Sequence, residues 1–138
     1  MVLQEDTIVD IPPNRVKYFG TTGKMLLPCP ATIAAMITKI PETKVITTDL
    51  LRKELTKQFE VEGTCPVTTK KSLQAVANER SNHVAYWRVV KQNGGLMAYY
   101  PGGVQSHAAL LRKEGIPVDT DGKEPRVNNV KKRLARLK

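Results

Sequence analysis

The stretch from Ala85 to Gly115 constrains the fold of this chain more than any other. Two glycine pairs mark turns, and a pattern with helical spacing follows the second pair. We expect a helix over Gln105–Lys113 with Ala108 and Leu111 facing inward, because Gly115 is a typical helix stop. The stretch therefore predicts two tight turns followed by a helix.

The order of residues here resembles the DNA-binding, active-site domain of methylated-DNA–protein cysteine methyltransferases. That family has the acceptor motif Pro-Cys-His-Arg-Val, then a glycine turn, a Tyr-x-Gly-Gly loop and Leu-Leu-x-x-Glu-Gly. The matching residues here are Arg88, Val89, Gly94, Leu96, Gly102, Gly103, Leu110, Leu111, Glu114 and Gly115. The resemblance implies a mainly α fold with a small β element, a winged helix-turn-helix like the alkyltransferase C-terminal domain.

Tyr86 stands where the family has its acceptor Cys, and Trp87 stands where it has the activating His. Alkyl transfer needs a thiolate and a neighbouring base, for which a phenol and an indole N–H are poor substitutes. We therefore expect no catalytic residue and no enzyme activity. The chain is similar to the alkyltransferase-like branch, whose members carry a bulky aromatic residue at the Cys position and bind alkylated DNA without repairing it.

The resemblance also implies a pocket for a base that has been flipped out of the duplex. Its floor is expected at Tyr86, and its walls and backing at Trp87, Tyr99, Tyr100, Val89 and Leu96. The loop is one residue longer than usual in the family, which leaves open whether Tyr99 or Tyr100 enters the pocket. Pro101 replaces the Ser that helps to read the guanine oxygen, so one donor is missing.

Glu114 matches the Glu that bonds the family's His. A carboxylate at the end of a helix is unfavourable to the helix dipole and usually has another partner. We expect Glu114 either to accept the indole hydrogen of Trp87 or to pair with Arg88, with a plain surface carboxylate as the third possibility.

The two preceding helices are expected to form the helix-turn-helix. One runs from Thr47 or Thr48 to about Phe59, and the other from Lys70 to about Ala77 with Thr68 or Thr69 as its cap. Before them, an apolar pattern at helical spacing predicts a helix over Ala31–Ile40, which Pro41 ends.

The DNA-binding residues follow from this placement. The exposed face of the second helix, together with the matching turn and loop positions, comprises Thr48, Lys70, Lys71, Gln74, Asn78, Gly102 and Gly103. The resemblance implies that Thr48 replaces a Tyr that rotates the target phosphate, and that Lys70 or Lys71 replaces an inserted Arg. Asn78 or Asn82 is the counterpart of the family's asparagine hinge, and either could equally be a helix C-cap.

Charge supports a polyanionic partner, because 22 Lys and Arg residues oppose 13 Asp and Glu residues, giving +9. Cys29, Cys65 and the two His residues have no metal-binding spacing, and neither Cys is followed by His-Arg. We expect no cofactor, no membrane span and a cytoplasmic monomer, associated with the nucleoid if the source is prokaryotic.

Three segments are expected along the chain. Residues 1–28 form an N-terminal arm with one short strand near Val16–Phe19, residues 29–118 form the DNA-binding domain, and residues 119–138 form a basic tail. An apolar stripe within the tail predicts either a helix that docks on the core and presents its basic residues to DNA phosphates, or a frayed terminus. The stripe consists of Val127, Val130, Leu134 and Leu137.

Three functions remain open. The first is a sensor that binds double-stranded DNA with an alkylated guanine, for which the sequence identifies no downstream repair partner. The second is a winged-helix protein of regulatory or architectural role that never flips a base and whose aromatic residues fill a vestigial pocket. The third is an enzyme that uses Tyr86, Arg88 and Glu114 for unrelated chemistry.

Overall fold

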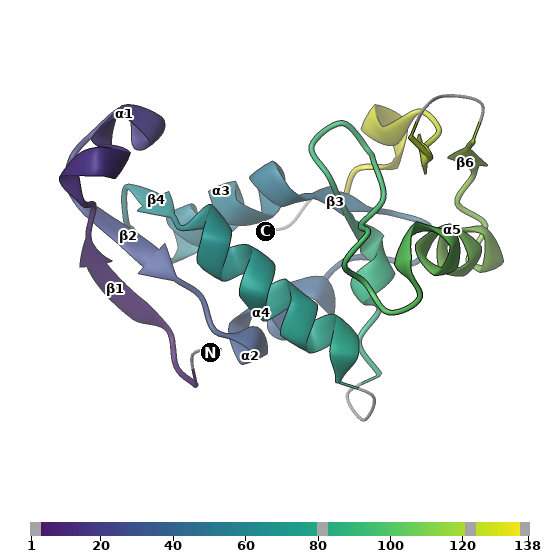
Figure 1. The fold of residues 1–138 in the computed structure, drawn as a ribbon, viewed down its shortest axis with the longest axis horizontal. Coiled ribbons are helices and arrows are strands. Elements are labelled where there is room, and N and C mark those ends of the chain that lie inside the picture. Colours follow the sequence, from purple (N-terminus) through teal and green to yellow (C-terminus); the bar gives the residue numbers. More distant parts are fainter. Residues whose placement is uncertain (1–3, 80–82, 121–123, 136–138) are drawn as a thin grey trace.

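The computed structural model describes residues 4–79, 83–120 and 124–135, and helices dominate it (Figure 1). The α-helices are α1 (Val16–Phe19), α2 (Pro30–Ile37), α3 (Thr48–Gln58), α4 (Pro66–Asn78) and α5 (Gly103–Lys113). Short 3-10 helices are η1 (Pro13–Arg15), η2 (Tyr86–Arg88) and η3 (Val130–Arg133). The predicted fold class, mainly α with a small β element, is confirmed.

The strands are short and pair across long stretches of sequence. β1 (Thr7–Asp10) runs antiparallel to β2 (Lys24–Leu27), which is parallel to β4 (Gly63–Thr64). β3 (Ile46–Thr47) is parallel to β5 (Val89–Val90), and β6 (Val118–Asp119) is antiparallel to β7 (Arg126–Val127). The β3–β5 pair joins the start of α3 to the end of η2, which contains the Tyr-Trp-Arg motif.

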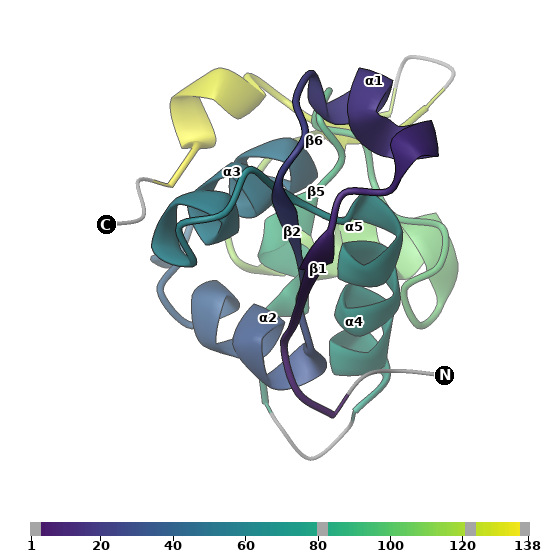
Figure 2. The same ribbon diagram turned by 90° about the vertical axis from the view of Figure 1, so that its left-hand side faces the viewer.

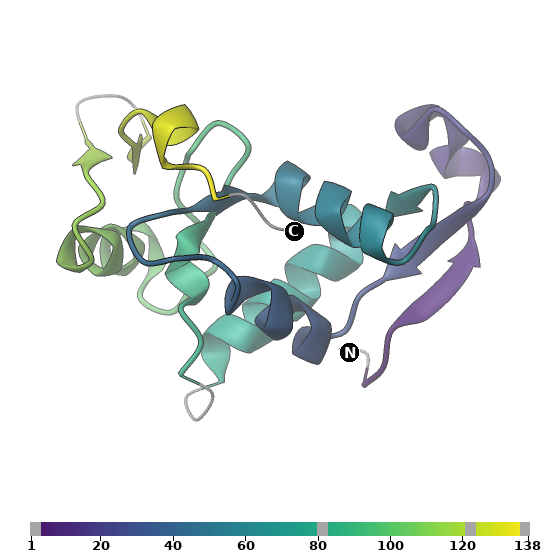
Figure 3. The ribbon, with the colours of Figure 1, turned by 180° about the vertical axis from the view of Figure 1, so that it is seen from behind.

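The main core lies between α2, α3 and α4, and a second apolar cluster lies beneath α5. Figure 3 shows α2 and α3 on the face opposite α4. In α2, Ile33, Met36 and Ile37 are buried at helical spacing. The helix ends at Ile37 rather than at Ile40, although Ile40 remains 2% exposed and still packs in the core. No helix in the described ranges is long and apolar enough to cross a membrane.

The prediction for residues 1–28 was wrong in its local structure. A strand was expected near Val16–Phe19, but that segment is α1, and strands flank it on both sides. Figure 2 shows β1 and β2 in front of the helices with α1 at the top of the hairpin. Pairing of β2 with β4 and burial of Ile11 and Met25 against Cys65 draw the segment onto the domain.

The expected C-terminal helix is also absent from the described part of the tail. Val127 lies in β7 and Val130 in η3, and Leu134 forms an isolated bridge with Val45. Asn129 adopts a left-handed φ of 52°, which interrupts any helix at this point. The apolar residues pack on the second cluster from separate short elements, and Leu137 lies outside the described residues.

α4 begins four residues earlier than the sequence suggested. Its N-cap is Cys65 and its first residue is Pro66, whose fixed φ suits the first turn and whose missing N–H is not needed there. Thr69 caps nothing, because its hydroxyl donates to the carbonyl oxygen of Cys65 at 2.8 Å. α3 has Thr47 at its N-cap position without a side-chain capping bond.

His107 is a fully buried polar residue of α5 that sequence reasoning overlooked. The Met97 N–H donates to its Nδ1 at 2.9 Å, so the single proton of the neutral ring lies on Nε2 and is donated to the Trp87 carbonyl at 2.8 Å. Burial lowers the pKa of His107 to about 4, against the opposing effect of the Trp87 bond. The imidazole thus stays neutral and joins α5 to η2 and to the loop before α5.

We predict that this buried imidazole makes stability depend on pH. The unfolded chain takes up a proton near the ordinary histidine pKa of about 6.5, whereas the folded chain does so only near 4, so stability falls as pH drops through this window. The expected loss between pH 7 and pH 5 is about 2 kcal/mol from this residue. Urea unfolding of the wild type and His107→Gln measures it, and a pH dependence that His107→Gln leaves unchanged would contradict the prediction.

His83→Gln is the matched control, because His83 is the other histidine and is exposed at the surface. The free energy of unfolding of His83→Gln should show the same dependence on pH as that of the wild type.

Candidate nucleic-acid interface

α4 has the two faces that the sequence predicted. Leu73, Val76 and Ala77 are buried against the core. The predicted binding residues on its outer face are all exposed, namely Lys70, Lys71, Gln74 and Asn78. The helix therefore presents cations and amides to solvent over most of its length.

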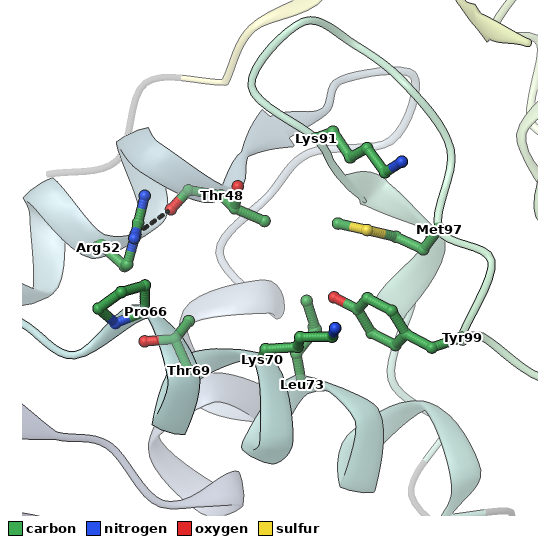
Figure 4. Close-up of a pocket in the computed structure, with 9 residues that line it drawn as sticks. All are labelled: Thr48, Arg52, Pro66, Thr69, Lys70, Leu73, Lys91, Met97 and Tyr99. Carbon is green, nitrogen blue, oxygen red and sulfur yellow. Dashed lines mark hydrogen bonds between the residues drawn. The ribbon is translucent and has the colours of Figure 1, made fainter. Parts of the chain in front are cut away.

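A cavity of about 270 Å³ opens beside this helix (Figure 4). Three elements meet around it: the first turns of α3, the first half of α4 and the loop that follows β5. Its lining residues are Thr48, Arg52, Pro66, Thr69, Lys70, Leu73, Lys91, Met97 and Tyr99. Thr48 and Lys70 were predicted at the DNA-binding surface, and Tyr99 was predicted in the pocket.

The cavity combines cations with an aromatic wall. Arg52, Lys70 and Lys91 line it, and no carboxylate is among its lining residues. The Lys70 Nζ lies 5.2 Å from the centroid of the Tyr99 ring, a cation–π distance. Burial raises the pKa of Tyr99 to about 12, which keeps the phenol neutral and able to donate a hydrogen bond. The site therefore favours a flat group that carries or adjoins negative charge.

Tyr100 does not wall this cavity but belongs to the core. It is 2% exposed, and its hydroxyl lies 3.1 Å from the Val89 carbonyl and 3.2 Å from the Tyr86 carbonyl. Of the two tyrosines, Tyr99 lines this cavity, and Tyr100 binds the backbone of η2 and β5.

Tyr86 was expected at the floor of the pocket, but Tyr100 lies between it and Tyr99. The Tyr86 ring packs edge-on against Tyr100 at 5.0 Å and against Trp87 at 5.4 Å, and it is not among the residues that line the cavity. Burial raises the pKa of Tyr86. Tyr86, Tyr99 and Tyr100 form a continuous stack of edge contacts that leads from the motif to the cavity.

Trp87, Arg88 and Glu114 come together in a second place. The indole Nε1 of Trp87 donates to Glu114 at 2.9 Å, and the Arg88 Nε donates to the same carboxylate at 2.9 Å, so both expected partners bind it at once. These residues line a separate hollow of about 430 Å³ with Glu42, Leu110 and Lys113.

The carboxylate of Glu114 is fully engaged. The Thr43 backbone N–H also donates to it at 2.7 Å. Burial alone would raise the pKa of Glu114, but the hydrogen bonds from Arg88, Trp87 and Thr43 and the guanidinium charge lower it below its ordinary value. Glu114 therefore fixes the end of α5 to η2 and to the turn before β3.

The remaining predicted residues shape turns and helix ends. Gly102 has φ 80°, and a Cβ there would lie 2.0 Å from the Ser106 Oγ, so glycine is required just before α5. Gly103 follows it as the first residue of α5, and Pro101 is exposed beside them. The Asn78 amide donates to the Gln74 carbonyl at 2.8 Å, a contact within its own helix end. Asn82 lies outside the described residues.

Sequence reasoning missed several lining residues. Arg52 lies one helical turn after Thr48, so the period of α3 could have placed it on the same face. Lys91 and Met97 lie in a loop without periodicity, and only tertiary structure brings them to the cavity. Within the described ranges, no cluster of three or more His, Cys, Asp or Glu residues could hold a metal ion.

We predict that breaking the Arg88–Glu114 pair is strongly destabilising. The two side chains are only 14% and 11% exposed, so Glu114→Gln leaves a largely buried guanidinium without its counter-charge. The expected loss is about 3–5 kcal/mol in chemical denaturation. The control is Asp10→Asn in the exposed Lys24–Asp10 pair, where about 1 kcal/mol or less is expected. Equal small losses in both variants would contradict a structural role for Glu114.

Comparison with known proteins finds similarity to solved structures but not to protein sequences or families. No protein-family model matches the chain, and no curated protein sequence does. Two crystal structures of the S. pombe alkyltransferase-like protein Atl1 are similar, both with a TM-score of 0.59 and covering 78% of this chain and 94% of the other. One is a complex with damaged DNA containing O6-carboxymethylguanine, at 19% identity, and the other a complex with DNA, at 18% identity. At this identity the likeness establishes architecture, and this chain shares the alkyltransferase-like fold.

Proposed function

We propose that this protein binds duplex DNA through α4 and receives a flipped-out alkylated guanine in the cavity beside Tyr99, without transferring the alkyl group. The observation that carries the proposal is the cavity itself. Cationic side chains, an aromatic wall and an apolar floor come together there, at the exposed face of a basic helix.

The lining suits one nucleotide. Tyr99 offers a ring face for a base, and Leu73 and Met97 provide apolar contact beneath it. Lys70 and Lys91 are placed to attract the phosphates on either side of that base, which is how most of the affinity for DNA arises. A volume of about 270 Å³ is slightly below the usual range for drug-sized ligands, as suits a single base. The Atl1 complex with an alkylated guanine, on the same fold, supports the choice of ligand.

The proposed absence of alkyl transfer is supported by the positions of the nucleophilic side chains. The motif position of the acceptor holds Tyr86, a neutral phenol that does not line the cavity. Cys29 and Cys65 are each 5% exposed, and neither lines the cavity. Cys65 is the nearer in sequence, since Pro66 is a lining residue. Burial raises the pKa of Cys65, but hydrogen bonds from the start of α4 and the Arg15 charge outweigh it and lower that pKa overall.

A second candidate function is supported by the aromatic stack. Tyr100 is core, and Tyr86 packs against it, so two of the predicted pocket residues fill space instead of lining it. This arrangement favours a DNA-binding protein that needs no extruded base, with a regulatory or architectural role. The two functions differ in one measurable respect, which is preference for the lesion.

We predict that the protein forms no adduct with alkylated DNA. Incubation with a duplex containing O6-methylguanine should leave the intact protein mass unchanged, because no accessible thiolate faces the cavity. Peptide mapping should show Cys29 and Cys65 unmodified. A methyl group on either cysteine would overturn the non-catalytic assignment, and Cys65 is the residue to examine first.

We predict that Tyr99→Ala selectively weakens binding to the lesion. Base stacking on an aromatic ring contributes about 1–3 kcal/mol, so affinity for an O6-methylguanine duplex should fall by roughly 5- to 150-fold. Affinity for the matched undamaged duplex should change by less than about 2-fold, since α4 still contacts the phosphates. Competition binding with the two duplexes measures both values.

Tyr99→Phe is the conservative control, because it keeps the ring and removes only the hydroxyl. It should retain most of the lesion preference. Equal losses on both duplexes for Tyr99→Ala, or no preference in the wild type, would favour the second candidate function. Thermal melting of each variant separates a binding defect from unfolding.

A further inference from the structure

The N-terminal hairpin brings an exposed tyrosine to the rim of the cavity. The Nη1 of Arg52 donates to the hydroxyl of Tyr18 at 3.0 Å, and the Nε of Arg52 lies 3.4 Å from the Thr48 carbonyl. Arg52 and Thr48 both line the cavity. The Arg52 side chain therefore links Tyr18, near the start of the chain, to a cavity formed by residues 48–99.

The hairpin is fixed at this position. α1 sits on β4 through Phe19, and a Cβ at Gly63 would lie 2.4 Å from the Phe19 ring, so only glycine permits this contact. The Nη1 of Arg15 lies 3.9 Å from the Sγ of Cys65, the N-cap of α4. Pairing of β2 with β4 anchors the other arm. α1 is thus attached to the N-terminal end of the helix that faces the DNA.

The surface that α1 presents has the chemistry of a nucleotide contact. Tyr18 is 59% exposed, with its ring edge-on to Phe19 at 4.9 Å and its hydroxyl held by Arg52. Such support fixes the orientation of the ring while leaving much of it accessible. Lys17 beside it is exposed, and α1 contains no acidic residue. An oriented aromatic ring next to a cation suits a base together with its phosphate.

We propose that α1 is a second DNA-contacting element, in which Tyr18 stacks on a nucleotide flanking the one at the cavity and Lys17 neutralises a neighbouring phosphate. This inference rests on the proposed binding of duplex DNA and extends that interface to the N-terminal hairpin. The hairpin then serves to lengthen the DNA contact along α4 and past its N-terminal end.

The test uses the full chain and a fluorescent duplex containing one O6-methylguanine, titrated at several salt concentrations. Tyr18→Ala should weaken binding by about 5-fold or more, the lower end of what one aromatic stacking contact provides. Tyr18→Phe keeps the ring and should stay within about 2-fold of wild type. Lys17→Ala should reduce the salt dependence by about one phosphate contact.

Lys24→Ala is the matched charge control on the same hairpin. Lys24 is paired with Asp10, and its backbone N–H donates to Glu62, so its surroundings are acidic and its loss should leave the salt dependence unchanged. Unchanged affinity in Tyr18→Ala and Lys17→Ala, with normal binding by the wild type, would overturn this inference alone. If Tyr18→Phe loses as much DNA affinity as Tyr18→Ala, the Tyr18 hydroxyl acts by holding Arg52 and the ring does not stack on a nucleotide. That result would also overturn the inference. A wild type that binds no DNA would overturn the proposed function as well.

Discussion

Two buried polar side chains hold the loop on which the cavity depends. His107 binds the Met97 N–H and the Trp87 carbonyl, and Tyr100 donates to the carbonyls of η2 and β5. The loop between β5 and α5 has little regular structure to fix it, and a loop with unsatisfied backbone groups could not stay buried. His107 satisfies the Met97 N–H of this loop, and Tyr100, itself in the loop, binds the carbonyls of η2 and β5. Together they set the positions of Met97 and Tyr99. The aromatic wall of the cavity is therefore a consequence of buried hydrogen bonding beneath it.

The hydrogen bonds around Glu114 hold η2 in place. Glu114 accepts a hydrogen bond from the Trp87 indole, which has a proton to donate and no lone pair with which to accept one. Arg88 shares the same carboxylate. Trp87, Arg88 and Glu114 together form a rigid support that fixes η2 to the end of α5.

Local periodicity decided which parts of the fold could be predicted. α5 and the two faces of α4 follow from apolar residues at helical spacing, and their burial agrees with the pattern. The N-terminal hairpin could not be predicted, because β2 is placed by its pairing with Gly63–Thr64 and β1 by its pairing with β2, and neither follows from an alternating pattern in the sequence. The predicted helix in the tail was wrong because tertiary contacts place its residues: Val127 pairs with Val118 and donates its N–H to the Gly94 carbonyl, and Leu134 bridges to Val45.

The residues of the candidate site also differ in how far the sequence could predict them. Lys70 was predicted from the exposed face of a helix and Thr48 from the family resemblance, whereas Lys91 and Met97 come from an aperiodic loop. The choice of Tyr99 over Tyr100 depends on a one-residue difference in where the loop turns inward, which no local pattern encodes.

Under the proposed function, selectivity for a damaged base depends on the interaction energies at Lys70 and Tyr99. In the free protein the Lys70 ammonium rests over the ring that a base would use, an interaction of about 0.5–1 kcal/mol at an exposed site. A base that enters must displace it and gains about 1–3 kcal/mol by stacking, while leaving the duplex costs a few kcal/mol. Stacking alone thus barely offsets extrusion of a well-paired base. A lesion that weakens pairing lowers that cost, and the displaced Lys70 can then move to a phosphate. On this balance the stability of the damaged pair matters as much as any contact inside the cavity.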